Sequence, residues 1–403
     1  MSLQETVSAE RVHIAWFGLR NAGKSSLVNA VTGQDLSIVS DVRGTTTDPV
    51  RKAMELLPLG PVVIIDTPGL DDEGTLGKLR VERTNRILSV TDIAVLAVDV
   101  TTGLSALDRE FLAMLSERKL PHILAYTKTD LAPANVKETR SAETDGVPVV
   151  FTSARTGEGI TELKELLGTF APKTAKEKGI LADLVEPGST VVLVTPIDGS
   201  APKGRLILPQ QLTLRELLDH HCTAVVCQPE ELAQTLAAFR NPPALVVTDS
   251  QAFGKVNAIV PPEIPLTSFS ILFARYKGNL QTLVEGAKAI DRLKEGDEVL
   301  ISEGCTHHRQ CEDIGTVKLP AWIEKHIGFR PKFTFTSGGD FTDTPGKYAL
   351  IIHCGGCTLP EREMQNRLDI ASSAGIPIVN YGIAIAHMNG ILERSLSVFR
   401  IFS

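Results

Sequence analysis

The chain has 403 residues, of which 43% are hydrophobic and 22% are charged, and its formal net charge is −7. This length predicts two to four domains, and the negative charge argues against a broad nucleic-acid-binding surface. No apolar run approaches the roughly 18 residues that span a bilayer, which argues against a membrane partner.

The first residues, MSLQETVSAERVHIAWFG, contain no basic segment followed by an apolar one, so no secretory signal is predicted. We therefore expect a cytoplasmic protein. In that compartment the six cysteines of the chain are expected to bind metal or to react rather than to form disulfides.

Residues 13–33, HIAWFGLRNAGKSSLVNAVTG, predict a strand, a glycine-rich loop and a helix in direct succession. The loop matches the pattern G-x-x-x-x-G-K-[ST] in the structural context that the pattern requires. Backbone N–H groups of such a loop bind the β-phosphate of a nucleotide, and the positive end of the helix adds to the attraction. Lys24 is predicted to reach the β- and γ-phosphates, and Ser25 to bind Mg²⁺. The predicted phosphate-binding residues are Gly18, Asn21, Ala22, Gly23, Lys24, Ser25 and Ser26.

Two later segments supply groups for the metal and the γ-phosphate. Residues 62–72, VVIIDTPGLDD, predict a buried strand that ends at Asp66, whose carboxylate would hold Mg²⁺ through water. Gly69 is predicted to offer its N–H to the γ-phosphate. The segment RGTTTD lies between these motifs and supplies a threonine to close over the metal, with Thr46 preferred and Thr45 next.

The base is expected to lie at the ends of two more predicted strands, ILAYTKTD (123–130) and VVFTSARTG (149–157). An aspartate there accepts two hydrogen bonds from guanine that adenine cannot donate, so GTP is the predicted nucleotide. The usual guanine motif is Asn-Lys-x-Asp, and Thr127 replaces the asparagine, which predicts weaker base affinity or selectivity. The predicted base-binding residues are Lys128, Asp130, Ser153 and Ala154.

These five motifs resemble those of the translation-factor-like GTPases, especially the branch that acts in tRNA modification and ribosome assembly. Leu70 stands where Ras-like proteins have the glutamine that orients water, and Asn21 stands where members of that branch help to bind potassium. The resemblance implies GTP hydrolysis in which K⁺ replaces an arginine finger. It implies catalytic roles for Lys24, Asn21, Thr46 and Gly69.

A polar segment rich in Pro, Gly and Lys follows, so we predict a P-loop GTPase domain over 1–170 and a linker over 171–189. The next segment alternates strand and helix patterns without a phosphate loop, which predicts a small α/β domain over 190–262. A unit of this size buries little by itself, so we expect it to pack against a second copy in a homodimer. Cys222 and Cys227 flank one of its strands, and a structural role is favoured over metal binding.

Residues 263–403 predict a third α/β unit with a mainly parallel sheet. Its predicted strands 297–302, 332–336 and 348–353 each end in a loop rich in Cys, His, Gly or Asp. In open parallel sheets the carboxyl ends of the strands form the ligand-binding edge. This topology places Cys305 near the pair in the sequence HCGGC, Cys354 and Cys357.

The residues alone leave the chemistry of these cysteines open. A stable disulfide is disfavoured by the compartment, and a redox dithiol gives no role to the sequence CTHH at 305–308. Three cysteines and a histidine would make a zinc site. The same thiolates with Gly355-Gly356 would also suit an iron–sulfur cluster, because glycines let backbone N–H groups approach the sulfides.

The order of the parts, a GTPase, a small α/β domain and a Cys-x-His … His-Cys-x-x-Cys domain, resembles the HydF family of [FeFe]-hydrogenase maturation GTPases. The resemblance covers the full length of the chain. It implies a [4Fe–4S] cluster on Cys305, Cys354 and Cys357 and dimerisation through the middle domain. It also implies a scaffold that receives a di-iron precursor and passes it to the apo-hydrogenase, with radical-SAM maturases as partners.

Three cysteines leave the fourth iron of such a cluster with a weaker or exchangeable ligand. His353 is expected to point away from Cys354 on its strand, whereas Glu312 and His307 belong to a loop that could move in. The remaining candidates for this fourth ligand are His308 and Cys311.

The sequence therefore predicts a GTP-hydrolysing carrier for metal-cluster assembly, in which nucleotide-sensitive segments near 40–50 and 67–80 gate exchange with partner proteins. One alternative is an RNA- or ribosome-associated GTPase with structural zinc. Another is a nucleotide-linked redox sensor in which residues 354 and 357 cycle between dithiol and disulfide.

Overall fold

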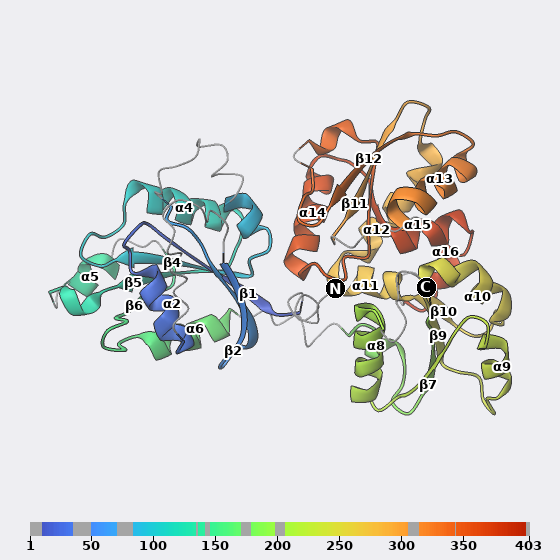
Figure 1. Cartoon of the computed structure of the whole chain (residues 1–403), viewed down its shortest axis with the longest axis horizontal. Coiled ribbons are helices and arrows are strands. Elements are labelled where there is room, and N and C mark those ends of the chain that lie inside the picture. Colours follow the sequence, from blue (N-terminus) through green and yellow to red (C-terminus); the bar gives the residue numbers. More distant parts are fainter. Residues whose placement is uncertain are drawn as a thin grey trace. The chain divides into compact units, whose positions relative to one another are not determined.

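The computed structural model describes residues 10–34, 50–70, 84–133, 136–141, 146–170, 179–197, 206–304, 314–342 and 344–399. They form two compact units, one over residues 10–173 and one over residues 174–403 (Figure 1). None of the described helices is long and apolar enough to cross a membrane.

The first unit is built on a six-stranded sheet with the order β2-β3-β1-β4-β5-β6. Strands β2 and β3 pair antiparallel, and all other neighbours pair in parallel. Its strands are β1 (Val12–Gly18), β2 (Val50–Leu56), β3 (Gly60–Asp66), β4 (Ile93–Asp99), β5 (His122–Thr127) and β6 (Val149–Phe151). Its helices are α2 (Lys24–Thr32), α4 (Ala106–Glu117), α5 (Val136–Ser141) and α6 (Ile160–Thr169), with the 3₁₀ turn η1 (Thr129–Leu131).

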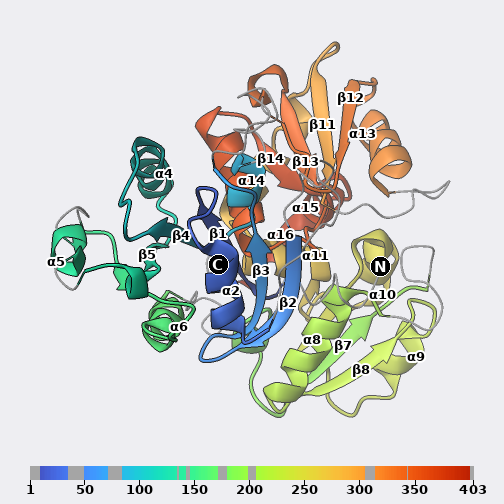
Figure 2. The same cartoon turned by 60° about the vertical axis from the view of Figure 1, so that its left-hand side comes forward.

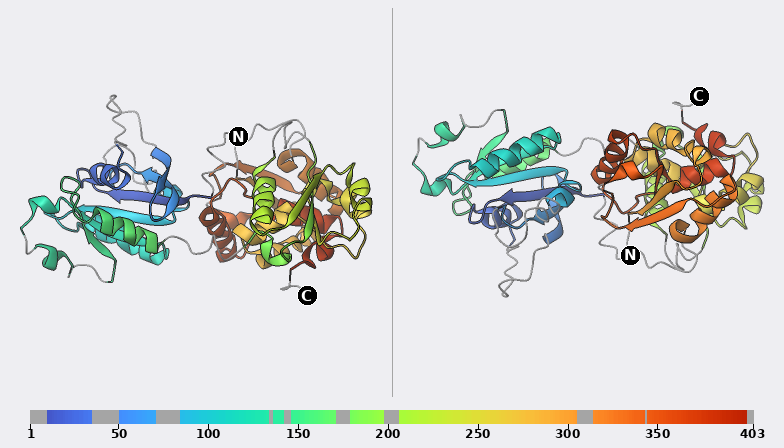
Figure 3. Two further views of the ribbon diagram at one scale, coloured as in Figure 1. Left: turned by 90° about the horizontal axis from the view of Figure 1, so that it is seen from below. Right: turned by 90° about the horizontal axis from the view of Figure 1, so that it is seen from above.

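The sheet of the first unit is covered on both faces, which explains why its strands are almost continuously apolar. Successive residues of β1 point to opposite faces: Ile14 and Trp16 join one buried cluster, and Ala15 and Phe17 join the other. Helices α2 and α6 cover the first face, and α4 covers the second (Figure 3). The central strand β4 was not among the predicted elements, although its residues are buried.

The second unit contains two parallel four-stranded sheets, with the orders β10-β9-β7-β8 and β12-β11-β13-β14 (Figure 2). The strands of the first of these sheets are β7 (Thr190–Val194), β8 (Thr223–Cys227), β9 (Leu245–Thr248) and β10 (Leu266–Ser268). Those of the other are β11 (Glu298–Glu303), β12 (Lys332–Ser337), β13 (Leu350–His353) and β14 (Ile378–Asn380).

Helices and short turns connect these strands. The helices are α8 (Leu208–Asp219), α9 (Leu232–Ala237), α10 (Phe253–Ile259), α11 (Phe269–Lys277), α12 (Leu280–Ala287), α13 (Leu319–Ile327), α14 (Glu361–Ser373), α15 (Tyr381–Met388) and α16 (Leu392–Leu396). The short turns are η2 (Ala182–Leu184), η3 (Ser250–Ala252), η4 (Ile290–Arg292), η5 (Ile314–Lys318) and η6 (Pro345–Lys347).

The α/β class with mainly parallel sheets is confirmed, but the two sheets of the second unit share a core. One continuous cluster of buried apolar residues runs from the strands of the middle sheet through α11 and α12 to the strands of the last sheet. Strand β10 pairs with β9, so the middle sheet continues past residue 262, where the sequence predicts a domain boundary.

Part of the predicted linker also belongs to this core. Ile180 and Leu181 are buried in the shared cluster. The carboxylate of Glu216 on α8 accepts hydrogen bonds from the N–H groups of Ile180, at 2.8 and 2.9 Å, and of Leu181, at 3.2 Å. Burial raises the pKa of Glu216, and these N–H donors oppose the rise. Residues 180–185 are therefore held in place by packing and by the half-buried carboxylate of Glu216, rather than forming a free connection.

Candidate functional site

The predicted phosphate loop lies between β1 and α2, and its two glycines occupy positions that other residues fit poorly. A Cβ on Gly18 would lie 2.6 Å from the carbonyl oxygen of Ala97 on the neighbouring β4. Gly23 has φ 81°, a left-handed conformation, and forms the N-cap of α2 without a capping side chain. No side chain therefore caps the first N–H groups of α2, and these donors are available to bind an anion.

The groups predicted to bind phosphate and magnesium lie next to one another. Lys24 Nζ is 3.2 Å from Asp66 Oδ1, and the side chain of Lys24 is only 10% exposed. Thr67 donates its hydroxyl to the carbonyl oxygen of Trp16 at 2.6 Å, and the N–H of Leu70 donates to the carbonyl oxygen of Gly18 at 3.0 Å. The segment with Gly69 is thus fastened to the start of the phosphate loop.

Leu70 itself is buried among the apolar residues between the sheet and α4. Its side chain can neither reach nor polarise a water molecule, which agrees with the predicted absence of a Ras-like glutamine. Thr45 and Thr46 lie outside the described residues.

The guanine motif is tied to the phosphate loop by two side chains. Thr127 donates its hydroxyl to the carbonyl oxygen of Ala22 at 2.5 Å. Lys128 Nζ donates to the carbonyl oxygen of Asn21 and to Asp99 Oδ2, both at 2.7 Å. Burial by itself would raise the pKa of Asp99, but hydrogen bonds from Lys128 and Thr101 outweigh it and lower the pKa. Asp99 was missed by the sequence analysis; its only signal was its place at the end of the apolar run IAVLAVD.

A cavity of about 640 Å³ opens beside these residues, between α2 and the loops after β5 and β6. Asp130 lines it, accepts a hydrogen bond from Ser153 Oγ at 2.6 Å and pairs with Arg155 Nε at 2.8 Å. The Ser153 bond lowers the pKa of Asp130, so the carboxylate is ionised and able to accept from a base. The lining residues are Gly23, Ser26, Leu27, Asn29, Ala30, Gly33, Gln34, Thr127, Lys128, Asp130, Leu131, Thr152, Ala154 and Arg155.

Thr127 allows a direct prediction. Replacement of Thr127 by valine keeps the shape of the side chain but leaves the carbonyl oxygen of Ala22 without this donor. We expect the Kd for GTP to rise about fivefold, which corresponds to about 1 kcal/mol for one net hydrogen bond. Titration with a fluorescent GTP analogue measures it. The matched control is Thr91→Val, which removes a buried hydroxyl bonded to the carbonyl oxygen of Ile87, away from the cavity lining. Equal affinities for both variants would contradict the role of Thr127.

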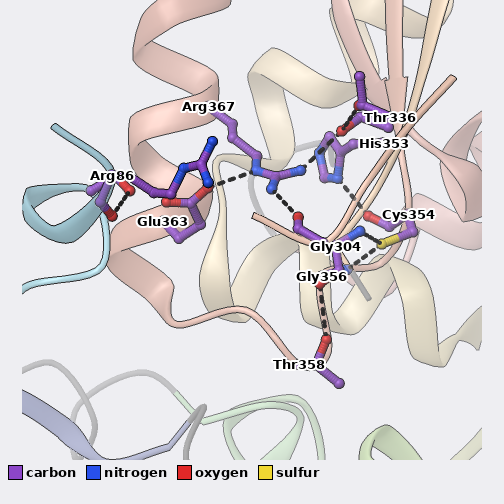
Figure 4. A network of polar contacts seen from close by, with 12 residues as sticks. Arg86, Gly304, Thr336, His353, Cys354, Gly356, Thr358, Glu363 and Arg367 are labelled. Atoms are coloured by element: carbon purple, nitrogen blue, oxygen red, sulfur yellow. Dashed lines mark hydrogen bonds and ion pairs between the residues drawn. The ribbon is translucent and has the colours of Figure 1, made fainter. Parts of the chain in front are cut away.

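A second group of candidate residues lies where β11 and β13 end (Figure 4). The sulfur of Cys354 accepts hydrogen bonds from the N–H of Gly304, at 3.0 Å, and from the N–H of Gly356, at 3.4 Å. Gly356 has φ 61°, and a Cβ there would lie 2.4 Å from the sulfur of Met364. Two N–H donors on one sulfur stabilise a thiolate, so this edge favours a charged or metal-bound Cys354.

Cys357 lies in a more apolar setting beside a buried cation. Burial, and then the neighbouring Cys354, raise the pKa of Cys357 to about 11. Lys277, at the end of α11 and 3% exposed, directs Nζ at the carbonyl oxygens of Leu359, at 3.1 Å, and Cys357, at 3.4 Å. Both thiols are free of disulfides. Lys277 therefore fastens the loop after Cys357, and its positive charge opposes the rise in the pKa of Cys357.

A fully buried arginine supports the same edge from α14 (Figure 4). Arg367 donates to Glu363 Oε1 at 3.1 Å, to Ser302 Oγ at 3.0 Å and to the carbonyl oxygen of Gly338 at 2.9 Å. Ser302 also accepts from Thr336 Oγ1 at 2.9 Å. Neither Lys277 nor Arg367 was predicted, because nothing in their local sequence marks them as buried.

The candidates for a fourth ligand are only partly described. His353 is 2% exposed, and its Nδ1 lies 2.5 Å from the carbonyl oxygen of Cys354. Burial lowers the pKa of His353 to about 4, so this imidazole is neutral near pH 7. Cys305, His307, His308, Cys311 and Glu312 lie outside the described residues, although Gly304, which directly precedes Cys305, touches Cys354.

Among the described residues, neither cysteine of the middle sheet belongs to a group of potential metal ligands. Cys222 is buried, with its sulfur 3.5 Å from the carbonyl oxygen of Glu186. Cys227 is half-buried, and burial raises its pKa. Both thiols are free, and this setting agrees with a structural role.

Family models match three successive parts of the chain. A model described as a 50S ribosome-binding GTPase matches residues 13–128. The hydrogen maturase F dimerization domain matches residues 180–278, and the hydrogen maturase F tetramerization domain matches residues 281–398. The two maturase models together cover most of the second unit. The chain belongs to the hydrogen maturase F family. The resemblance stated from the sequence is thereby confirmed.

Curated relatives of this hydrogen maturase F chain include proteins named as GTPases. The tRNA modification GTPase MnmE of Chromobacterium violaceum is 37% identical over 178 residues, which are 44% of this chain and 38% of that protein. The GTPase Der of Kosmotoga olearia is 34% identical over 208 residues, which are 48% of this chain and 46% of that protein. The chain thus spans less than half the length of these relatives.

Two solved structures are similar to part of the chain. The G domain of the T. maritima FeoB iron transporter is 30% identical with a TM-score of 0.32, over 40% of this chain and 99% of that chain. Aquifex aeolicus Era bound to GDP and AlF₄⁻ is 19% identical with a TM-score of 0.35, over 54% of this chain and 93% of that chain.

Proposed function

We propose that this hydrogen maturase F chain is a GTP-hydrolysing scaffold that carries a di-iron precursor to apo-[FeFe]-hydrogenase. The observation that carries the proposal is the contact between the loops after β11 and β13, where Gly304 N–H meets the sulfur of Cys354 at 3.0 Å. It brings the segment leading to Cys305 against the Cys354–Cys357 pair in a chain that also has a nucleotide-binding loop.

A [4Fe–4S] cluster fits the described residues of this edge. Among the described residues, Cys354 and Cys357 form no disulfide, two N–H groups point at the sulfur of Cys354, and a Cβ on Gly355 would have no neighbour closer than 4.0 Å. These are the features that cluster-binding loops need: thiolates, N–H donors to sulfur and little bulk. Cys305, Cys354 and Cys357 would hold the cluster. When bound, it would supply an iron with one exchangeable position, for which Glu312, His307 and His353 are the candidate protein ligands.

The first unit would bind GTP with Mg²⁺. Lys24 would neutralise the β- and γ-phosphates, Ser25 and Thr46 would bind the metal, and Asp66 would hold it through water. Asp130 would accept the two guanine donors from its place in the cavity, with Ser153 and Ala154 beside it.

Potassium would assist hydrolysis in this proposal. Buried Leu70 offers no polar group, so the charge that develops on the phosphates needs another cation. The side chain of Asn21 is exposed on the phosphate loop, while its carbonyl oxygen is bound to Lys128. Asn21 would bind K⁺ there, and Gly69 would donate its N–H to the γ-phosphate.

The partners would be radical-SAM maturases, the apo-hydrogenase and further copies of the chain. The matched dimerization and tetramerization domains support a homo-oligomer, and the tetramerization domain would extend the predicted dimer to a tetramer through residues 281–398. The middle sheet ends in β8, an edge strand whose side chains are mostly half-buried or exposed.

Anaerobic purification with metal analysis tests the cluster. We expect four irons per chain, brown colour and an electron-paramagnetic signal on reduction, all lost in Cys354→Ala and Cys357→Ala and retained in Cys222→Ala. Transfer is tested by activating apo-hydrogenase with loaded wild-type protein. Stoichiometric zinc without colour that is lost in Cys354→Ala and Cys357→Ala would point to the ribosome-associated alternative, and no metal at these cysteines to the dithiol. Either result would overturn the proposal.

A substitution of Lys277 tests the site without changing either cysteine. Replacement of Lys277 by methionine keeps the length of the side chain but removes its bonds to the carbonyl oxygens of Cys357 and Leu359. We expect the reconstituted protein to lose iron several-fold faster to a chelator, because the loop is less constrained and thiolate charge is less compensated. The control is Lys288→Met, an exposed lysine at the end of α12. Equal rates of iron loss in the two variants would show that Lys277 has no role at the cysteines.

A further inference from the structure

Three potential metal ligands meet on the last sheet, away from the cysteines. Asp291 belongs to η4, His326 to the last turn of α13 and His387 to the last turn of α15. His326 Nε2 lies 2.8 Å from Asp291 Oδ1, and His387 Nε2 lies 2.8 Å from Asp291 Oδ2. One ligand atom from each residue lies within 4.8 Å of the other two. We call these three residues the His–Asp–His cluster.

The topology places the His–Asp–His cluster at the amino ends of the parallel strands, whereas Cys354 lies at their carboxyl ends. Turn η4 precedes the start of β11, and α13 ends shortly before the start of β12. Helix α15 begins directly after the carboxyl end of β14 and runs back beside α13 (Figure 1). All three residues therefore lie where the parallel strands begin, whereas Cys354 follows the end of β13. The two groups of ligands form separate sites.

Two imidazole nitrogens and one carboxylate oxygen are the ligands that Zn²⁺ and similar divalent ions prefer. Bonds of about 2.0–2.1 Å in a tetrahedral zinc site put neighbouring ligand atoms roughly 3.3 Å apart. The observed 2.8 Å separations, one to each carboxylate oxygen, are about half an ångström shorter than this, and the ligand atoms all lie within 4.8 Å of one another, so the side chains must shift to meet on one ion. The side chains of Asp291, His326 and His387 are 51%, 29% and 20% exposed, so an ion can enter and a water molecule can complete its coordination.

The charge of the carboxylate also suits a cation. Burial alone would raise the pKa of Asp291, but hydrogen bonds from His326 and His387 outweigh it and lower the pKa. The alternative role of these contacts is structural: the two hydrogen bonds to Asp291 would join η4 to α13 and α15 without a metal. The metal and the hydrogen bonds exclude one another, because metal binding needs both Nε2 atoms unprotonated, with the ring proton on Nδ1.

We propose that Asp291, His326 and His387 bind a divalent transition-metal ion, Zn²⁺ first among them, in a site independent of the cysteines. A metal there would join the segment before β11 to the ends of α13 and α15. It would thereby stabilise the part of the chain matched by the tetramerization domain.

Cobalt titration of the full-length protein tests this site, because Co²⁺ reports its ligands by its spectrum. Nitrogen and oxygen ligands give weak visible bands only, whereas cysteine thiolates add an intense sulfur-to-cobalt charge-transfer band. We expect wild-type protein, measured without its cluster, to bind one equivalent of Co²⁺ that adds nothing to the charge-transfer band and that Zn²⁺ displaces. His387→Ala should lose this equivalent, and Asp291→Asn should bind it at least tenfold more weakly.

The matched control is Lys325→Ala, which changes an exposed neighbour of His326 on the same helix turn. It should bind cobalt like the wild type. His326→Gln, a milder change at the surface, is a second test should His387→Ala fold poorly. We also expect Zn²⁺ to raise the Tm of wild-type protein and of Lys325→Ala but not of His326→Gln. Equal uptake of nitrogen- and oxygen-bound cobalt in wild type and histidine variants, or uptake at thiolates alone, would overturn the proposal.

Discussion

Replacement of Lys24 by alanine is expected to lower the kcat of GTP hydrolysis by at least about 100-fold, the usual effect of removing one positioned cationic donor from a transition state. The side chain of Lys24 is only 10% exposed, and its Nζ lies 3.2 Å from Asp66 Oδ1, where the phosphates and the metal are proposed to bind. Phosphate release at saturating GTP measures the effect. Binding of a fluorescent GTP analogue separates loss of affinity from loss of rate.

The control for this variant is Lys52→Ala, which removes an exposed lysine of β2 in the same unit. Hydrolysis by Lys24→Ala at the rate of this control would show that the loop does not bind the phosphates as proposed. The same variant tests gating. If Lys24→Ala loses hydrolysis but exchanges partner proteins with unchanged GTP dependence, the nucleotide site stands and the gating role is wrong.

Replacement of Arg367 by methionine is expected to lower the free energy of unfolding by about 3–5 kcal/mol, the usual cost of removing one partner from a buried ion pair. Arg367 is fully buried and donates to Glu363, to Ser302 and to the carbonyl oxygen of Gly338. The uncompensated carboxylate of Glu363 accounts for most of the loss. Urea unfolding followed by circular dichroism measures it.

A second substitution tests the reason for this loss. The double variant Arg367→Met with Glu363→Met removes both charges and should be more stable than Arg367→Met alone. Arg330→Met, which removes an exposed ion pair with Glu324, should change stability little. If Arg367→Met behaves like Arg330→Met, the buried network does not stabilise the edge that carries Cys354.

The nucleotide-binding part could be predicted well because its signals are local. Gly18, Gly23 and Lys24 lie within seven residues of one another. Both glycines have positive φ, a conformation that the presence of glycine in the sequence already indicates. The apolar run before them needs a sheet that is covered on both faces, as observed. Strand β4 is equally apolar but carries no motif. It was therefore not predicted, although it lies at the centre of the sheet.

Domain boundaries were predicted less well, because polar composition is a weak signal where a buried partner is remote in sequence. Residues 180 and 181 have the composition of a linker. The structure instead shows their N–H groups bonded to the carboxylate of Glu216. Strand β10 has only three residues, and its pairing with β9 decides to which sheet it belongs.

By itself, the sequence determined the α/β class, the phosphate loop, the guanine motif with its threonine, and the cysteines that follow β11 and β13. Each of these depends on residues close together in the chain, where short-range geometry limits the possible structures. The groups that support these features are distant in sequence, and they come together only when the chain folds. They are Asp99 beside Lys128, Lys277 beside Cys357, Arg367 beside Ser302, and the His–Asp–His cluster. Burial and pairing of such groups arise when remote segments pack, and a lysine, arginine or histidine read in sequence is equally compatible with an exposed surface.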